Sequence, residues 1–145
     1  MRATVNDAGL DPRSLVFEVT ETVLLDDTER VAATIGELRD LGVRFALDDF
    51  GTGYSSLSYL HTLPFDMLKI AKSFVDGLAR GGREASFVRM IIELARTLGV
   101  TVIAEGIEEH DQAVALVALE CDLGQGFYLG LPQPVRRELP LLAVA

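Results

Sequence analysis

The sequence lacks several features that mark common protein classes. Cys121 is its only cysteine, so it cannot form an internal disulfide. Only 13 residues are Lys or Arg against 22 Asp or Glu, and the formal net charge of -9 argues against a nucleic-acid binder, because affinity for a phosphate backbone depends on clustered cations. No apolar run approaches the roughly 18 to 20 residues of a membrane-spanning helix, and no apolar signal core opens the sequence. We therefore expect a cytoplasmic segment without membrane contact, whose parent protein can still be membrane-anchored elsewhere.

Patterns that predict a zinc site are missing too. The two histidines, His61 and His110, lie in helical or turn contexts, and neither His-x-x-His nor Cys-x-x-Cys spacing occurs. Apolar residues make up 49% of the chain, which is enough for a sizeable core in one domain. Cys121 lies between two acids, so we interpret it as a packing thiol and not a reactive one.

Short β-rich runs alternate with segments of helical periodicity, which is typical of an α/β fold with parallel strands and helical crossovers. Strands are expected at 15–20, 43–47, 66–70 and 100–104, with a last short strand near 126–128. Helices are expected from the cap candidates at 26–28 to about Gly42, near 55–63, at about 84–98 and at about 111–119. Such β/α repetition predicts a sheet whose loops carry the functional residues.

A short internal echo supports repeated β/α units. Leu41-Gly42-Val43 leads to Asp48 at the same spacing at which Leu98-Gly99-Val100 leads to Glu105. Each copy passes from a glycine helix stop into an apolar strand and ends on a carboxylate. Barrel and open-sheet enzymes place their sites at that end of their strands.

Charged residues follow or end most of the expected strands. They are Glu18, Asp48, Asp49, Lys69 and Glu105. If the strands are neighbours in one parallel sheet, the four carboxylates converge on one mouth, where their repulsion favours bound cations. Carboxylate oxygens suit Mg²⁺ or Mn²⁺, and a pair of such ions is the recurring route to phosphodiester hydrolysis.

Alternatives remain open at each position. A single carboxylate at a strand end is more often a helix cap or a solvated loop residue, and only the joint placement favours a site. Glu21 and Glu108 lie three residues beyond Glu18 and Glu105, on the expected loops, and are either supports of the site or exposed acids. Lys69 falls within a buried strand, so we expect it to have an anionic neighbour.

The stretch at 49–56 predicts a tight loop over a strand end. Gly51 and Gly53 flank a threonine, and Ser55-Ser56 can cap the next helix. The loop lacks the Gly-Lys-Ser/Thr ending of a nucleotide-binding P-loop, and by itself it is compatible with an ordinary βα turn.

Five motifs in order carry a family resemblance. They are Phe17–Glu21, Asp48–Leu57, Leu68–Ile70 with Ser73–Val75, Ala104–Glu108 and Gln125–Tyr128. This series resembles the EAL domain family over nearly the whole chain. The resemblance implies a modified TIM barrel that hydrolyses cyclic di-GMP to linear pGpG with Mg²⁺ or Mn²⁺. It also implies that residues 1–145 form one partial EAL domain, a partial TIM-type (β/α) barrel with only the later β/α units, because a complete barrel needs about 250 residues.

The resemblance also implies roles for the strand-end residues. Glu18 and Asp48 would bind one metal ion, and Asp48, Asp49 and Glu105 the second. Lys69 would contact the attacking water, so Lys69 and Glu105 are the candidate catalytic residues.

Further residues would support the site or bind the substrate. By the same resemblance Glu21 would hold the Asp48-Asp49 loop in shape, and Glu108 and Gln125 would support the metal shell or contact the nucleotide. The expected partner is cyclic di-GMP, and the intact domain would be a homodimer.

Departures from the family pattern leave a second function open. The family's Glu-Ala-Leu motif and its metal-binding asparagine, both expected upstream of Glu18, are absent from this sequence, and Ala71 stands where the family usually has Asp. A non-catalytic cyclic di-GMP receptor or a protein-interaction module is the alternative. An unclosed barrel would also leave sheet edges exposed, so we expect the isolated chain to oligomerise or aggregate.

Overall fold

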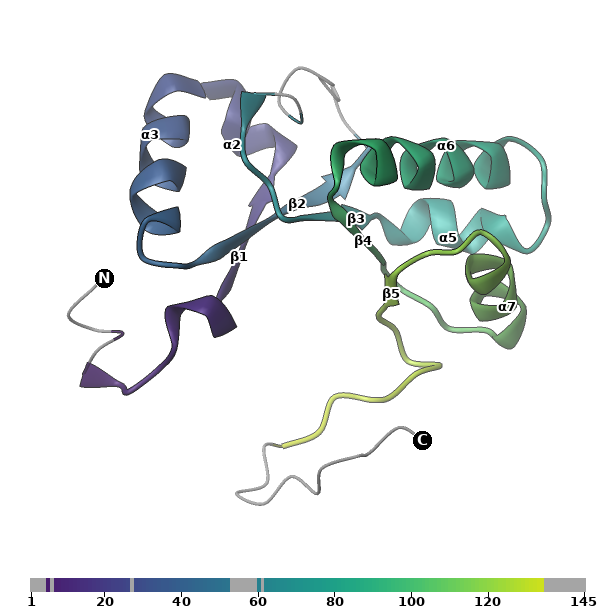
Figure 1. Ribbon diagram of the computed structural model, residues 1–145. Helices are drawn as coiled ribbons and strands as arrows, with labels where there is room; N and C mark the ends of the chain where they lie inside the picture. The colour runs from purple at the N-terminus through teal and green to yellow at the C-terminus, as the bar shows by residue number, and fades with distance from the viewer. Residues whose placement is uncertain (1–4, 6, 27, 53–59, 61, 135–145) are drawn as a thin grey trace.

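The computed structural model describes residues 5, 7–26, 28–52, 60 and 62–134, and within them five parallel strands form one sheet in the order β1-β2-β3-β4-β5. The strands are β1 (Val16–Thr20), β2 (Arg44–Phe50), β3 (Met67–Ile70), β4 (Thr101–Ala104) and β5 (Leu123–Gly124) (Figure 1). Strand order equals chain order, as in consecutive units of a β/α barrel. The expected α/β fold is confirmed.

Helices connect the strands. After the short 3₁₀ turn η1 (Pro12–Ser14) and β1 come α2 (Glu21–Asp26) and α3 (Thr28–Arg39); α5 (Lys72–Leu78) and α6 (Arg83–Leu98) follow β3, and α7 (His110–Ala118) follows β4. No helix in the described part of the chain is long and apolar enough to cross a membrane.

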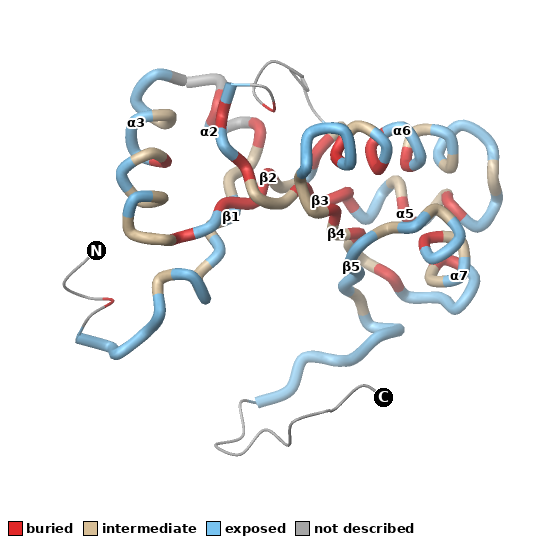
Figure 2. The backbone as a smooth tube through the Cα atoms, viewed as in Figure 1, coloured by how far each residue is buried: buried red, intermediate tan, exposed pale blue. Residues whose placement is uncertain are grey.

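The core lies between one face of the sheet and these helices. Leu47, Leu68 and Val102 lie side by side in the strand register and are almost fully buried. Because side chains alternate across a strand, these residues share a face, and they pack in one apolar cluster with residues such as Ile35 of α3 and Ile91 of α6. Figure 2 shows this buried centre along β2 to β4, with an exposed segment after β5.

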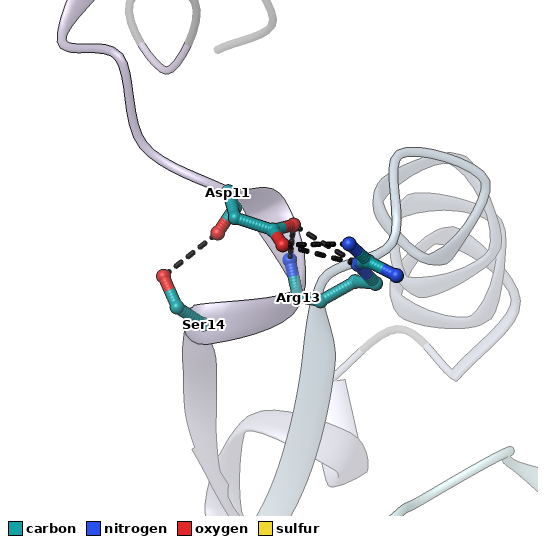
Figure 3. Close-up of polar contacts among 3 residues, drawn as sticks. All are labelled: Asp11, Arg13 and Ser14. Carbon is teal, nitrogen blue, oxygen red and sulfur yellow. Dashed lines mark hydrogen bonds and ion pairs between the residues drawn. The ribbon is translucent and has the colours of Figure 1, made fainter.

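The start of β1 is fixed by a local polar turn. The Asp11 carboxylate accepts hydrogen bonds from the Arg13 backbone and guanidinium, and the Ser14 hydroxyl donates to the Asp11 carbonyl (Figure 3). The Arg13 stem lies against Gly42, where a Cβ would be 3.2 Å from Arg13 Cγ. This turn therefore holds the entries of β1 and β2 together, at the end of the sheet opposite the candidate site.

The two copies of the internal echo fold alike. In each, an aspartate just before the next strand caps a backbone N–H of the strand beside it: Asp66 accepts from Phe45 at 2.8 Å, and Asp122 accepts from Val102 at 2.8 Å. Arg39, near the end of α3, also contacts Asp66 and the Pro64 carbonyl. Repeated β/α units are thus confirmed in structure.

Several expected boundaries were wrong. The last strand is β5 at Leu123–Gly124, not 126–128, because Gly126 lies directly against the Ile107 backbone and the chain turns there. Glu21 begins helix α2 and is not a loop residue, and α5 was not predicted. The second strand runs on through Phe50 and includes the acid pair. The helix expected near 55–63 lies largely outside the described residues.

Each outer strand has a sheet neighbour on one side only within the described residues. These strands are β1, with Val16 exposed, and β5, with Leu123 exposed. Residues after β5 add further exposed apolar side chains, including Phe127 and Leu131. Open edges and apolar surface of this kind favour association, so the expectation that the isolated chain oligomerises stays a prediction.

Candidate active site at the carboxyl end of the sheet

Lys69 is the centre of a charged cluster at the carboxyl end of the strands. Its side chain is 6% exposed, and Nζ lies 2.6 Å from Glu105 Oε1, 2.7 Å from Glu18 Oε1 and 3.1 Å from Asp48 Oδ1. The partners come from β1, β2 and the end of β4, so the parallel register brings them together. The expectation that Lys69 has an anionic neighbour is confirmed, and the structure shows three of them.

The protonation state of Lys69 follows from two opposing effects. Burial favours the neutral amine and lowers its pKa, but hydrogen bonds to Glu105, Glu18 and Asp48 outweigh burial and raise the pKa above its ordinary value. A raised pKa in the folded state means that the cation stabilises the fold at every pH below the unfolded pKa, and that this contribution is lost only as pH rises through the folded pKa. Lys69 is therefore a permanent cation at neutral pH.

A bulge in β2 brings Asp48 and Asp49 into the same site. The register with β3 shifts between Leu47 and Phe50, and Asp49 has φ of 52°. Consecutive side chains of a regular strand point to opposite faces, and the bulge with its left-handed residue removes that alternation. The Asp49 backbone N–H donates a hydrogen bond to Asp48 Oδ1 at 3.0 Å, which stabilises the bulge locally.

Three carboxylates are placed to share a cation. Oxygens of Asp48, Asp49 and Glu105 all lie within 4.8 Å of one another. A donor set made only of carboxylate oxygens fits a hard cation such as Mg²⁺ or Mn²⁺ and disfavours zinc. Glu18 joins this group through Lys69 and has a half-exposed side chain at 52%. The metal roles predicted for the four acids are compatible with these positions and stay predictions.

The loop after the acid pair is held from two sides. The Gly51 N–H donates to Glu21 Oε1 at 3.2 Å, and Glu21 is buried at 9% exposure. On the other side a Cβ at Gly51 would lie 2.8 Å from Phe87 and 3.1 Å from Phe74, so only glycine fits there. The two phenylalanine rings contact each other with centroids 4.6 Å apart. The support that Glu21 was expected to give this loop is compatible with this hydrogen bond.

The segment after β4 carries Glu105 and is clamped by the segment after β5. The Ile107 N–H donates to the Gln125 carbonyl at 3.0 Å, and the Gln125 N–H donates to the Ala104 carbonyl at 2.8 Å. Gly126 lies against the Ile107 backbone with no room for a side chain. The described contacts of Gln125 are thus made by its backbone, and its predicted role toward metal or nucleotide stays a prediction.

Glu108 lies away from the three-carboxylate group and pairs with a second lysine. Lys72 Nζ is 3.2 Å from Glu108 Oε2 and 2.7 Å from Asp76 Oδ1. Hydrogen bonds to Asp76 and Glu108 raise the pKa of Lys72. Neither Lys72 nor Phe87 was predicted from the sequence, and Gly126 was expected in a strand and not as a contact of Ile107. The only sequence signal for Lys72 is its three-residue spacing from Lys69, equal to the spacing of Glu105 and Glu108.

The fold and the site are those of a β/α-barrel protein. Acids and one buried lysine gather at the carboxyl ends of parallel strands, where β/α barrels carry their active sites. The family model "EAL domain" matches residues 1–132. The chain belongs to the EAL domain family, as its motifs predicted.

Two curated relatives illustrate the match. The chain is 41% identical over 135 residues to the bifunctional diguanylate cyclase/cyclic di-GMP phosphodiesterase MucR of Pseudomonas aeruginosa, covering 93% of this chain and 20% of MucR. It is 38% identical to the cyclic di-GMP phosphodiesterase NbdA of the same organism, covering 93% of this chain and 17% of NbdA. The chain thus spans about a fifth of the length of these proteins.

Solved structures agree with the fold. The P. aeruginosa MucR phosphodiesterase in complex with c-di-GMP superposes with a TM-score of 0.86 at 41% identity, covering 92% of this chain and 54% of that one. A manganese/c-di-GMP complex of Klebsiella pneumoniae BlrP1 gives 0.81 at 33% identity, covering 86% and 32%. The chain is therefore part of a TIM-barrel-like EAL domain, and the predicted partial barrel is confirmed.

Proposed function

We propose that this chain forms the C-terminal portion of a phosphodiesterase domain that hydrolyses cyclic di-GMP to linear pGpG with Mg²⁺ or Mn²⁺. The observation that carries the proposal is the position of Lys69, which is buried and within 3.1 Å of acids from β1, β2 and the residue after β4, with Asp49 beside them. The c-di-GMP phosphodiesterase MucR, at 41% identity, supports it.

The residues divide the work by their chemistry. Asp48, Asp49 and Glu105 hold one divalent cation, and Glu18 together with Asp48 holds a second. Bound cations of this kind supply a water of lowered pKa and offset negative charge on the phosphoryl group. Lys69 lies within 3.1 Å of the acids that would hold the cations, so its amine can donate hydrogen bonds that orient the attacking water or a phosphoryl oxygen.

The substrate makes the cations necessary. Cyclic di-GMP is an anion, whereas the chain has a formal net charge of -9 and acids dominate the site. A dianionic ligand would be repelled by the acid cluster alone, and divalent cations reverse the sign of the local charge.

The test is turnover by the chain extended with its upstream coding sequence. We expect cyclic di-GMP to be converted to pGpG in Mg²⁺ or Mn²⁺, and the conversion to stop in excess EDTA and return when metal is added back. Hydrolysis that persists in EDTA would contradict metal dependence. If neither Mg²⁺ nor Mn²⁺ supports hydrolysis, the proposed enzymatic function is contradicted.

A receptor without catalysis is the second candidate, and Ala71 favours it. Ala71 is 3% exposed and lies between Lys69 and Lys72, at a position where the family usually has Asp. The loss of a carboxylate there weakens the control of water or metal without removing the binding site. Calorimetry separates the two functions, because a receptor gives a cyclic di-GMP binding isotherm and no pGpG, and Ala71→Asp would then restore turnover.

A further inference from the structure

The two lysines of this chain lie on one short segment, and each holds one acid of the segment beside it. Lys69 pairs with Glu105, and Lys72 pairs with Glu108. The two pairs share a three-residue spacing, so they form two rungs between the exit of β3 and the exit of β4.

The strand register brings the two segments side by side just before the second pair. Lys69 lies opposite Ile103 and Ile70 opposite Ala104, and the Glu105 N–H donates to the Ile70 carbonyl at 3.1 Å. The ladder ends with Ile70 and Ala104, and Lys72 begins α5 two residues later. Its side chain lies against Gly106, in the loop that leads from Glu105 to Glu108.

The aliphatic part of the Lys72 side chain packs directly against Gly106. The φ of Gly106 is +68°, and a Cβ there would lie 2.6 Å from Cβ and 2.7 Å from Cδ of Lys72, and nearer still to Cγ. Gly106 is thus required twice, for its left-handed backbone and for the close approach of Lys72. The contact lies one residue after Glu105, which is a member of the candidate site.

Backbone N–H groups of the same loop donate further hydrogen bonds that hold it in place. The buried Gln112 side chain accepts the N–H of Glu108 at 2.8 Å and that of Glu109 at 3.0 Å, and the Ile107 N–H donates to Gln125. Lys72 contacts the loop at Gly106 and pairs with Glu108. The loop is therefore held by contacts with α7, with the segment after β5 and with the first residue of α5.

We propose that Lys72 is a positioning residue, which seats on Gly106 and holds Glu108 so that the Glu105 carboxylate stays beside Lys69 and Asp48. The proposal deepens the proposed function of the same site and rests on it only for the metal readout. Lys72 acts through the loop and not through contact with a reacting group, because both of its charged partners are acids of the protein.

Hydrogen exchange of the amides at 107–109 tests the positioning without metal or nucleotide, in the chain extended upstream. We expect Lys72→Met, which keeps most of the stem, to speed exchange about two- to fivefold, the size of one exposed ion pair. Lys72→Ala also removes the packing against Gly106 and should speed exchange further, whereas Lys72→Arg should keep exchange slow. Asp76→Asn is the matched control, because it removes the other partner of Lys72 without touching the loop, and it should leave exchange unchanged.

The affinity for Mn²⁺ distinguishes a positioning role of Lys72 from a purely electrostatic effect, because the two predict opposite changes in Lys72→Met. If Lys72 only adds positive charge near the site, Lys72→Met binds Mn²⁺ more tightly. If Lys72 positions Glu105, Lys72→Met binds Mn²⁺ about two- to fivefold more weakly in an electron paramagnetic resonance titration, and Lys72→Arg recovers the affinity. Tighter binding, or exchange at 107–109 that is unchanged in Lys72→Ala, would overturn the proposal. A wild-type protein that binds no Mn²⁺ would contradict the proposed function, while the exchange data would still decide the role of Lys72.

Discussion

Asp48 and Asp49 are consecutive residues of β2, yet their carboxylate oxygens lie within 4.8 Å of each other and of Glu105. The left-handed backbone of Asp49, with φ of 52°, inside a register shift makes this possible. A bulge of this kind is common beside active sites, where it redirects a side chain at some cost in backbone strain. The acid pair thus depends on an unusual backbone as much as on its charge.

Substitutions at Asp49 separate these two contributions. Asn tolerates the left-handed region, so Asp49→Asn should leave the free energy of unfolding within about 0.5 kcal/mol while reducing Mn²⁺ affinity at least about tenfold. Valine also disfavours the left-handed backbone conformation of this position, so Asp49→Val should lower the free energy of unfolding by about a further 1–2 kcal/mol. Chemical denaturation and metal titration measure the two effects. Equal stability of both variants would contradict the strain assigned to this residue.

Glu21 should control the shape of the Gly51 loop. Glu21→Ala removes the acceptor of the Gly51 N–H and should cost about 1–2 kcal/mol of stability together with a larger loss of turnover. Glu21→Gln keeps an acceptor oxygen and should retain most of both. Glu37→Ala, an exposed acid of α3, is the control and should change neither. Normal turnover in Glu21→Ala would show that the loop does not need this hydrogen bond.

Asp66 lies at the opposite end of the sheet and should affect stability alone. It accepts the Phe45 N–H at 2.8 Å and contacts Arg39, so Asp66→Ala leaves a buried donor without that acceptor and should cost about 1–3 kcal/mol. Turnover per folded molecule should not change, because no site residue is touched. A drop in kcat at a temperature where the variant is fully folded would argue that the two ends of the sheet are coupled.

Cys121 should report on unfolding. Burial raises the pKa of its thiol, so the reactive thiolate is scarcer in the folded state than in the unfolded chain at neutral pH. Because the pKa of the thiol is higher in the folded than in the unfolded state, the unfolded chain loses this proton first as pH rises. The free energy of unfolding therefore falls above the unfolded pKa of Cys121. Alkylation at pH 7 should be slow in native protein and fast in urea. Rapid native labelling would contradict the packing role of this cysteine.

The sequence predicted the elements whose signals are local. Apolar runs identified four of the strands within one to three residues at their boundaries, and the acids at their ends followed from parallel pairing. The bulge at Asp49 was not predictable, because the left-handed residue is an aspartate and the register shift is visible only against β3. The last strand was misplaced, because Gly126 and the two aromatic residues after it have strand-like composition, whereas the Ile107 backbone decides the turn.

Residues that act through tertiary contacts escaped prediction for the same reason. Phe87 comes from α6 and meets Gly51 only after the helix folds back on the sheet. Lys72 begins a helix of seven residues that has no side-chain cap, directly after a buried strand, which leaves little local signal. Its pairing with Glu108 requires the β3–β4 register, which the sequence does not specify.

The hydrolysis of cyclic di-GMP by a Lys69→Met variant tests the central claim most directly. In Mn²⁺, the wild-type chain extended upstream should produce pGpG, and Lys69→Met should lower kcat at least about 100-fold with cyclic di-GMP binding retained. Arg80→Met, which removes an exposed cation outside the site, is the matched control and should keep wild-type turnover. If Lys69→Met produces pGpG at the wild-type rate, Lys69 does not orient the reacting groups and the proposed site is contradicted.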